Sequence, residues 1–369
     1  MTPARLTAAM ASGLLLWATD GAGARTTLAA GTTAGLSAAS DPSLVTTAGV
    51  GPVSDVVQYH YTMTARVRPL VLFWITRSGV GDAVVTRRRA PGETDYSLLI
   101  GSDPERAPRR INRWGYIDEE IRGAEARLIG LMTESDEASI EEAEASVRKQ
   151  SRGSRTFKVI QATVEGEQAR SVVTSIAAPE NYSFRQVRTV LELAQREGSE
   201  GTPRVVRLPA GTRPGFLSAL ADLMDRAPSR GGQADRDGQA GRGSRGGSGG
   251  PHARGQAGNG SEVVKFVYHG SIYELRETRA HLMPTMRVGG AAYQHVVAAE
   301  FEIRSTNDGE LTEFSITYGT EGALAGVPLT ASFQPRWWME IDLAIDSGTS
   351  LGTSDLGFAS RQTNLGNRP

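Results

Sequence analysis

The chain contains no cysteine among its 369 residues. This absence excludes disulfide bonds, zinc sites built on thiolates, a cysteine nucleophile and a lipid-modified N-terminal cysteine. The chain also lacks an excess of either charge, because its 40 basic residues are matched by 41 acidic ones. Proteins that bind nucleic acid nonspecifically usually carry a basic excess, so we expect no nucleic acid partner.

Histidine is scarce, with five residues, and none of them stands at the spacing of a zinc motif. We therefore expect neither a bound metal nor a cofactor. Beyond the N-terminus there is no apolar run of the roughly 20 residues that a membrane-spanning helix needs, so we expect no membrane span in the mature chain.

The N-terminus has the three parts of a signal peptide in the right order. Arg5 supplies a positive charge, residues 7–18 are apolar, and Ala22-Gly23-Ala24 has the small residues that signal peptidase requires. The apolar run is too short to span a membrane. The sequence predicts a signal peptide over residues 1–24 and hence a periplasmic or secreted protein.

Composition divides the rest of the chain. Residues rich in Gly, Ser and Thr, or in Gly, Arg and Ser, cannot bury enough apolar surface to fold alone. The segments predicted on this basis are a flexible low-complexity segment (25–52), an α+β domain (53–228), a disordered Gly/Arg/Ser linker or loop (229–260), an antiparallel β domain (261–346) and a loose polar tail (347–369). The sequence leaves open whether the two β segments are separate domains or one sheet with a long inserted loop.

The fold class predicted is mainly β or α+β, with antiparallel sheets that form a barrel or a sandwich. From Val57 to Val67 apolar and polar residues alternate strictly, which is typical of a half-buried strand. Residues 78–82 have the chemistry of a turn, and residues 101–123 read as an irregular polar loop. About three helices are predicted in the first half, at 135–149, 183–197 and 215–227.

One motif suggests an enzyme. Asp346-Ser347-Gly348 follows an apolar strand and looks like the hairpin of aspartic peptidases, in which two carboxylates share a proton to activate water. The chain has no second copy of the motif. His60, on the polar face of its strand, is a second candidate for a reactive group.

Two groups of residues are candidates for ligand binding. Arginines next to aromatic rings suit an anionic or planar ligand. Neighbouring residues on a strand point to opposite faces, so one member of a Trp-Trp pair is expected to be exposed. The candidates are Arg109, Arg110, Arg113, Trp114, Tyr116, Trp337 and Trp338. Acidic residues 118–120 could instead pair with the arginines and order the loop.

Three stretches carry a resemblance when taken together: 65–74, 110–116, and Gly326-Val327-Pro328 through Trp337-Trp338. This set resembles an uncharacterised family of exported bacterial proteins, over most of residues 53–346. The resemblance implies an envelope or secreted location. It implies no known activity and no functional residue.

The leading hypothesis is an exported, non-enzymatic β protein that binds an unidentified small ligand or a cell-envelope partner. A hydrolase acting through Asp346 or His60 and a structural envelope component are the alternatives. An apolar cavity favours binding, a cleft in which Asp346 or His60 meets a second titratable group favours catalysis, and neither feature is expected of a structural component.

The signal peptide gives a first testable prediction. In the native host we expect the chain to be cut after Ala24, so that the mature protein begins at Arg25. N-terminal sequencing or intact mass spectrometry of the protein from extracytoplasmic fractions measures this. An intact chain that keeps Met1 and remains in the cytosol would contradict export.

Overall fold

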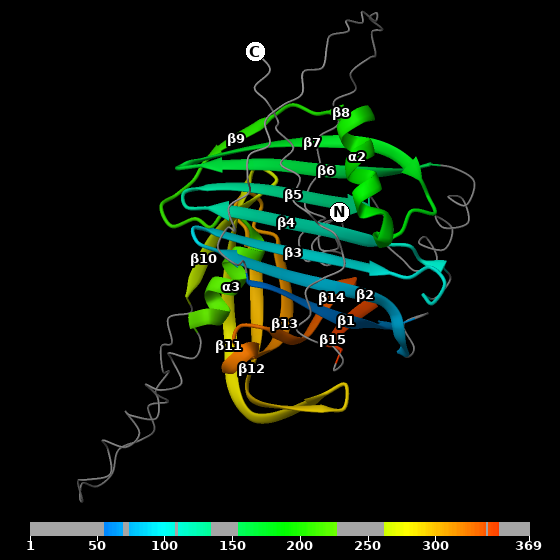
Figure 1. The fold of residues 1–369 in the computed structure, drawn as a ribbon, viewed down its shortest axis with the longest axis vertical. Coiled ribbons are helices and arrows are strands. Elements are labelled where there is room, and N and C mark those ends of the chain that lie inside the picture. The colour runs from blue at the N-terminus through cyan, green and yellow to red at the C-terminus, as the bar shows by residue number, and fades with distance from the viewer. Residues whose placement is uncertain are drawn as a thin grey trace, which may run out of the picture.

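A computed structural model describes residues 55–68, 74–107, 110–133, 154–226, 262–336 and 339–346 (Figure 1). The signal peptide, the segment at 25–52, the helix expected at 135–149, the linker at 229–260 and the tail at 347–369 lie outside these residues.

The described residues form strands with few helices. The strands are β1 (Asp55–Val67), β2 (Ile75–Ala90), β3 (Glu93–Ser102), β4 (Trp114–Arg122), β5 (Glu125–Thr133), β6 (Ser154–Glu165), β7 (Gln168–Pro179), β8 (Ser199–Glu200), β9 (Arg204–Arg207), β10 (Val263–Tyr268), β11 (Ser271–Val288), β12 (Ala291–Ser305), β13 (Leu311–Gly319), β14 (Pro328–Arg336) and β15 (Met339–Ile345). The helices are α2 (Val187–Glu197), α3 (Phe216–Arg226) and the short 3-10 helices η3 (Phe184–Gln186) and η4 (Gly322–Leu324). The antiparallel, mainly β fold class is confirmed, and two of the three expected helices are present.

All fifteen strands of the described residues belong to one sheet. Its order is β10-β11-β12-β13-β14-β15-β1-β2-β3-β4-β5-β6-β7-β8, and β9 pairs with β7 beside β8. Strand β1 pairs antiparallel with β2 on one side and with β15 on the other. These two ladders join the N-terminal and C-terminal strands, which the sequence left open as separate domains or one sheet, in a continuous open sheet.

The alternation predicted for residues 57–67 is present in β1. Val57, Tyr59, Tyr61, Met63 and Ala65 are all buried, whereas the residues between them are exposed or half-buried. The period of two in side-chain direction therefore places one face of β1 in the core.

Two local predictions were wrong. Residues 78–82 form no turn but a bulge inside the long strand β2, where the register to β1 shifts between Met63 and Thr64. The bulge accommodates the two extra residues, so glycines that resembled a turn bend a strand. Residues 114–122, expected in a loop, form strand β4, because their apolar side chains are buried on both faces of the sheet.

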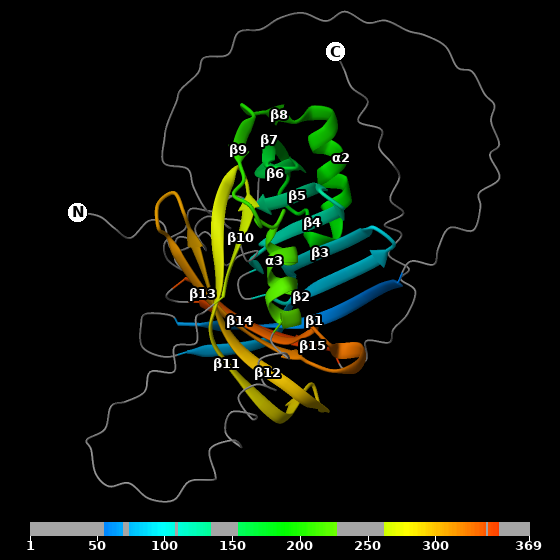
Figure 2. The same ribbon diagram turned by 90° about the vertical axis from the view of Figure 1, so that its left-hand side faces the viewer.

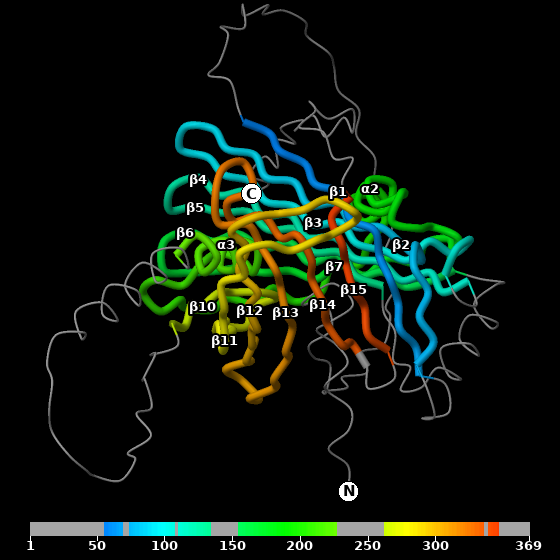
Figure 3. Tube along the Cα trace, turned by 90° about the horizontal axis from the view of Figure 1, so that it is seen from below, coloured from blue at the N-terminus to red at the C-terminus, as the bar shows by residue number. Residues whose placement is uncertain are grey.

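The sheet curls on itself. Figures 2 and 3 show β10–β13 crossing one face of the strands β2–β7, and Figure 2 shows α3 between the two groups. The curl brings edge strand β10 back to the segment before α3, where the amide of Arg213 donates to Lys265 O (2.7 Å) and that of Val267 donates to Arg213 O (3.2 Å). Pairing of this kind protects part of an otherwise open sheet edge.

Within the described residues, three cores stabilise the curled sheet, and the smallest of them contains Ala126, Leu128 and Val267. The main core lies inside the curl and includes Phe216, Leu220 and Leu223 of α3. A second core lies on the opposite face of the sheet, where α2 covers Trp114 and Phe157. No helix in the described ranges is long and apolar enough to cross a membrane.

A buried carboxylate fixes the start of α3. Glu119, on the inner face of β4, accepts hydrogen bonds from the backbone amides of Leu217 (2.7 Å) and Ser218 (2.9 Å). These amides have no partner within the helix, and the positive end of the helix dipole favours the carboxylate charge. A Cβ atom at residue 215 would lie 2.3 Å from the Glu119 carboxylate, so glycine is required at Gly215.

Burial raises the pKa of Glu119 to about 7 from its ordinary value of 4.5, although the two amides oppose this shift. The folded state therefore binds more protons than the unfolded state between these values. Stability must fall as the pH rises through this window, by up to roughly 3 kcal/mol.

We expect the substitution Glu119→Gln to remove this part of the pH dependence. Urea unfolding at pH 5 and pH 7.5 measures the free energy of unfolding of each variant. Its decrease between the two pH values should be smaller in Glu119→Gln than in the wild type. Glu192→Gln, on the exposed side of α2, is the control, and an equal decrease in all three proteins would contradict the assignment.

Candidate ligand-binding site

The structure separates the residues predicted to bind a ligand. Arg109, Trp337 and Trp338 lie outside the described residues. Arg110 is exposed and has a positive φ of 59°, and Arg113 is half-buried.

The two aromatic candidates of this group are both buried under α2. The side chain of Trp114 packs against Phe157, with ring centroids 5.3 Å apart, and its Nε1 donates to Tyr182 O at 3.0 Å. The hydroxyl of Tyr116 donates to the carboxylate of Asp118. These contacts bring Trp114 and Tyr116 into the second core, while ligand binding by this group stays a prediction.

Acidic residues 118–120 come after this loop, and their partners are not its arginines. Glu119 caps α3, and Glu120 forms an ion pair with Arg122. Burial raises the pKa of Asp118 to about 6, and the nearby charges of Asp95 and Glu120 act in the same direction.

The residues of the hydrolase hypothesis lie on the outer, exposed face of β1 and at the end of β15. The hydroxyl of Thr62 donates to the Asp346 carboxylate at 2.6 Å, and the Asp346 amide donates to His60 O at 2.9 Å. His60 and Asp346 are both exposed, and residues 347–350 lie outside the described part. Within that part, no three His, Asp or Glu side chains gather where they could hold a metal ion.

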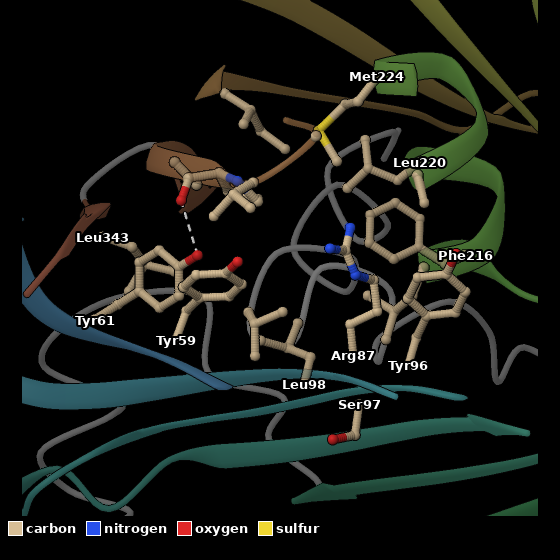
Figure 4. Close-up of a pocket in the computed structure, with 18 of the residues that line it drawn as sticks. Tyr59, Tyr61, Arg87, Tyr96, Ser97, Leu98, Phe216, Leu220, Met224 and Leu343 are labelled. Atoms are coloured by element: carbon tan, nitrogen blue, oxygen red, sulfur yellow. Dashed lines mark hydrogen bonds between the residues drawn. The ribbon is translucent and has the colours of Figure 1, made fainter. Parts of the chain in front are cut away.

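An apolar pocket lies inside the curl, between the inner face of β1–β3 and helix α3 (Figure 4). Its volume is about 90 Å³, it is partly open to solvent, and its lining is almost entirely apolar. No pattern in the sequence indicated this pocket or the residues that lie opposite one another across it.

The floor of the pocket follows from the register of the sheet. Tyr59 pairs with Val85, and Val85 pairs with Leu98, so the three side chains form a row across β1, β2 and β3. The roof is one face of α3, where Phe216, Leu220 and Met224 recur at every fourth residue. Strand and helix periodicity therefore place apolar side chains on both sides of one space.

Two tyrosines of β1 close one side of the pocket. The hydroxyl of Tyr61 donates to Pro328 O at 2.8 Å, and that of Tyr59 donates to Ala323 O at 3.4 Å. Burial raises the pKa of Tyr61, so its hydroxyl stays neutral. Because both hydroxyls are directed at backbone carbonyls, the rings present their apolar surface to the pocket.

The opposite end of the pocket is charged and faces solvent. Arg87 lines it beside Tyr96, to which it is paired in the register of β2 and β3 (Figure 4). Asp225 of α3 also lines this end, and it lies 3.8 Å from Arg89. Both side chains of that ion pair are about half exposed, at 52% and 48%, so the pair contributes little stability.

A second, larger cleft of about 540 Å³ lies over β5–β7. Its lining mixes apolar side chains with Lys158, Glu200, Arg204 and His269. Charges of both signs line it, and it offers no continuous apolar wall. We therefore take the smaller pocket under α3 as the candidate site.

Comparison with known proteins finds no match, since no family model, no curated protein and no solved structure is significantly similar to this chain. The resemblance to exported bacterial proteins therefore stays a prediction.

The hydrogen bond of Tyr61 gives a prediction for the closed side of the pocket. Tyr61→Phe leaves the Pro328 carbonyl without this donor, so we expect the free energy of unfolding to fall by about 1 kcal/mol. Denaturant unfolding measures it. Tyr182→Phe is the control, because the structure gives the half-buried Tyr182 hydroxyl no hydrogen bond to the described residues, and a similar loss in both variants would contradict the assignment.

Proposed function

We propose that this protein is an exported, non-enzymatic β protein that binds a small apolar ligand in the pocket between β1–β3 and α3. The observation that carries the proposal is the apolar lining of a pocket that is partly open to solvent. A few polar groups at one end of an apolar cavity are typical of small-molecule sites. Export rests on the predicted signal peptide alone.

The size of the pocket limits the ligand. At about 90 Å³ it is smaller than the cavity of roughly 150 Å³ that holds benzene in an engineered core. It therefore encloses only part of an alkyl chain such as an octyl group, and the remaining atoms extend through the open side of the pocket. Each buried methylene contributes about 0.8 kcal/mol, so a short chain alone binds weakly, in the millimolar range.

A methyl group inside the pocket can report binding. Met224 lines the roof, whereas Met63 belongs to the same core but does not line the pocket. With ¹³C-methyl-labelled methionine, we expect titration with 1-octanol to shift the Met224 resonance saturably and to leave Met63 almost unchanged. The substitution Met224→Leu assigns the resonance.

A pair of variants makes this test specific. Ala331→Leu adds three carbon atoms to the lining on β14, so we expect it to weaken octanol binding several-fold or abolish it. Ala177→Leu makes the same change at an exposed position of β7 and should bind as the wild type does. If octanol shifts no Met224 signal in the folded wild type, the proposed function is wrong.

A further inference from the structure

Arg87 stands at an inward position of its strand. It follows Ala83 and Val85 at a spacing of two, and these side chains face the main core. In the register of the sheet it lies between Val57 of β1 and Tyr96 of β3. A guanidinium group is thus directed at the apolar space under α3 (Figure 4).

The neighbouring arginines of β2 have carboxylate partners, and Arg87 does not. Arg88 pairs with Glu93 (2.6 Å) and with Asp95, and Arg89 pairs with Asp225. Among the described residues no carboxylate lies within ion-pair distance of Arg87, and no hydrogen bond of its guanidinium is found. A charge at an apolar wall is costly unless an opposite charge accompanies it.

The charges at this end are unevenly paired. Arg87 and Arg89 carry two positive charges there, and Asp225 and Asp55 carry two negative charges, with Asp55 opposite Arg89 in the register of β1 and β2. Asp225 pairs with Arg89, and among the described residues no ion pair joins a carboxylate to Arg87. An anion at this end would give the Arg87 guanidinium a direct partner.

From these contacts we infer that the ligand is a single-chain amphiphile with one anionic head group, a carboxylate or a phosphate, that pairs with Arg87. This inference rests on the proposed function and names the class of ligand. The planar guanidinium can donate two parallel hydrogen bonds to either head group.

The tail then runs along the floor of the pocket. From the row of Arg87 to the row of Tyr61 there are four residues along β1, or roughly 13 Å at the rise of an extended strand. The apolar side chains of Tyr59, Val85 and Leu98 lie between these rows. One unbranched chain follows this path, and a volume of about 90 Å³ leaves no room for a second chain.

Matched octyl probes test the inference in the folded, full-length mature protein. Octanoate, octyl phosphate, 1-octanol and octylammonium share one tail and differ in the head group. We expect at least one of the two anions to bind about tenfold more tightly than octanol, and octylammonium to bind more weakly than octanol. The shift of the Met224 methyl resonance during each titration gives the dissociation constant of that probe. The anion that binds more tightly identifies the head group.

Variants assign the preference to Arg87. Arg87→Gln should reduce the affinity for the anion to that for octanol, while octanol binding stays within about twofold. Arg87→Lys keeps the positive charge but lacks the paired donors of the planar guanidinium, so it should retain part of the preference for the anion over octanol. Arg127→Gln, an exposed change of the same charge on β5, should bind every probe as the wild type does.

The outcomes separate the two proposals. If octanol and both anions bind the wild type equally, the head-group inference fails and the apolar pocket stands. If no probe shifts Met224, the proposed function fails as well. Should Arg87→Gln not fold, the comparison of octanoate with octylammonium in the wild type still decides, because equal affinities would overturn the inference.

Discussion

The pairing of β1 with both β2 and β15 is the constraint on which the rest of the structure depends. It joins strands that are nearly 300 residues apart into one antiparallel sheet. Because neighbouring strands twist in one sense, so long a sheet curls instead of staying flat. The curl brings β10–β13 over the face of β2–β7 and creates an interior large enough to hold α3.

Helix α3 is held in that interior by apolar packing and by hydrogen bonds. Its apolar face enters the main core, and its first amides donate to the buried carboxylate of Glu119. Burying a carboxylate costs free energy, which the two amides and the helix dipole partly offset. The two hydrogen bonds anchor the first turn of α3 to strand β4, beside the pocket that α3 covers.

The pocket divides its chemistry between two ends. Tyr61 closes one end through a hydrogen bond to a backbone carbonyl, which hides its polar atom. Arg87 stands at the other end, where the half-exposed Arg89–Asp225 pair faces solvent. In the proposed complex, the apolar tail and the charge-assisted contact at the head are complementary, because neither alone gives a strong complex.

The sequence by itself determined the local structure. The alternation in β1 and the two helices expected at 183–197 and 215–227 are readable, because side-chain direction repeats with a period of 2 or 3.6 residues. It failed where glycines marked a bulge in β2 and where charged residues belonged to β4. Arg87 stands two residues after Val85, so the sequence already places both on the same face of the strand. A charged residue among apolar ones does not by itself show what its side chain contacts. Only the tertiary structure decided that β1 meets β15, that Glu119 meets α3 and that Arg87 meets the pocket. Those contacts join residues far apart in the chain, and no local periodicity specifies them.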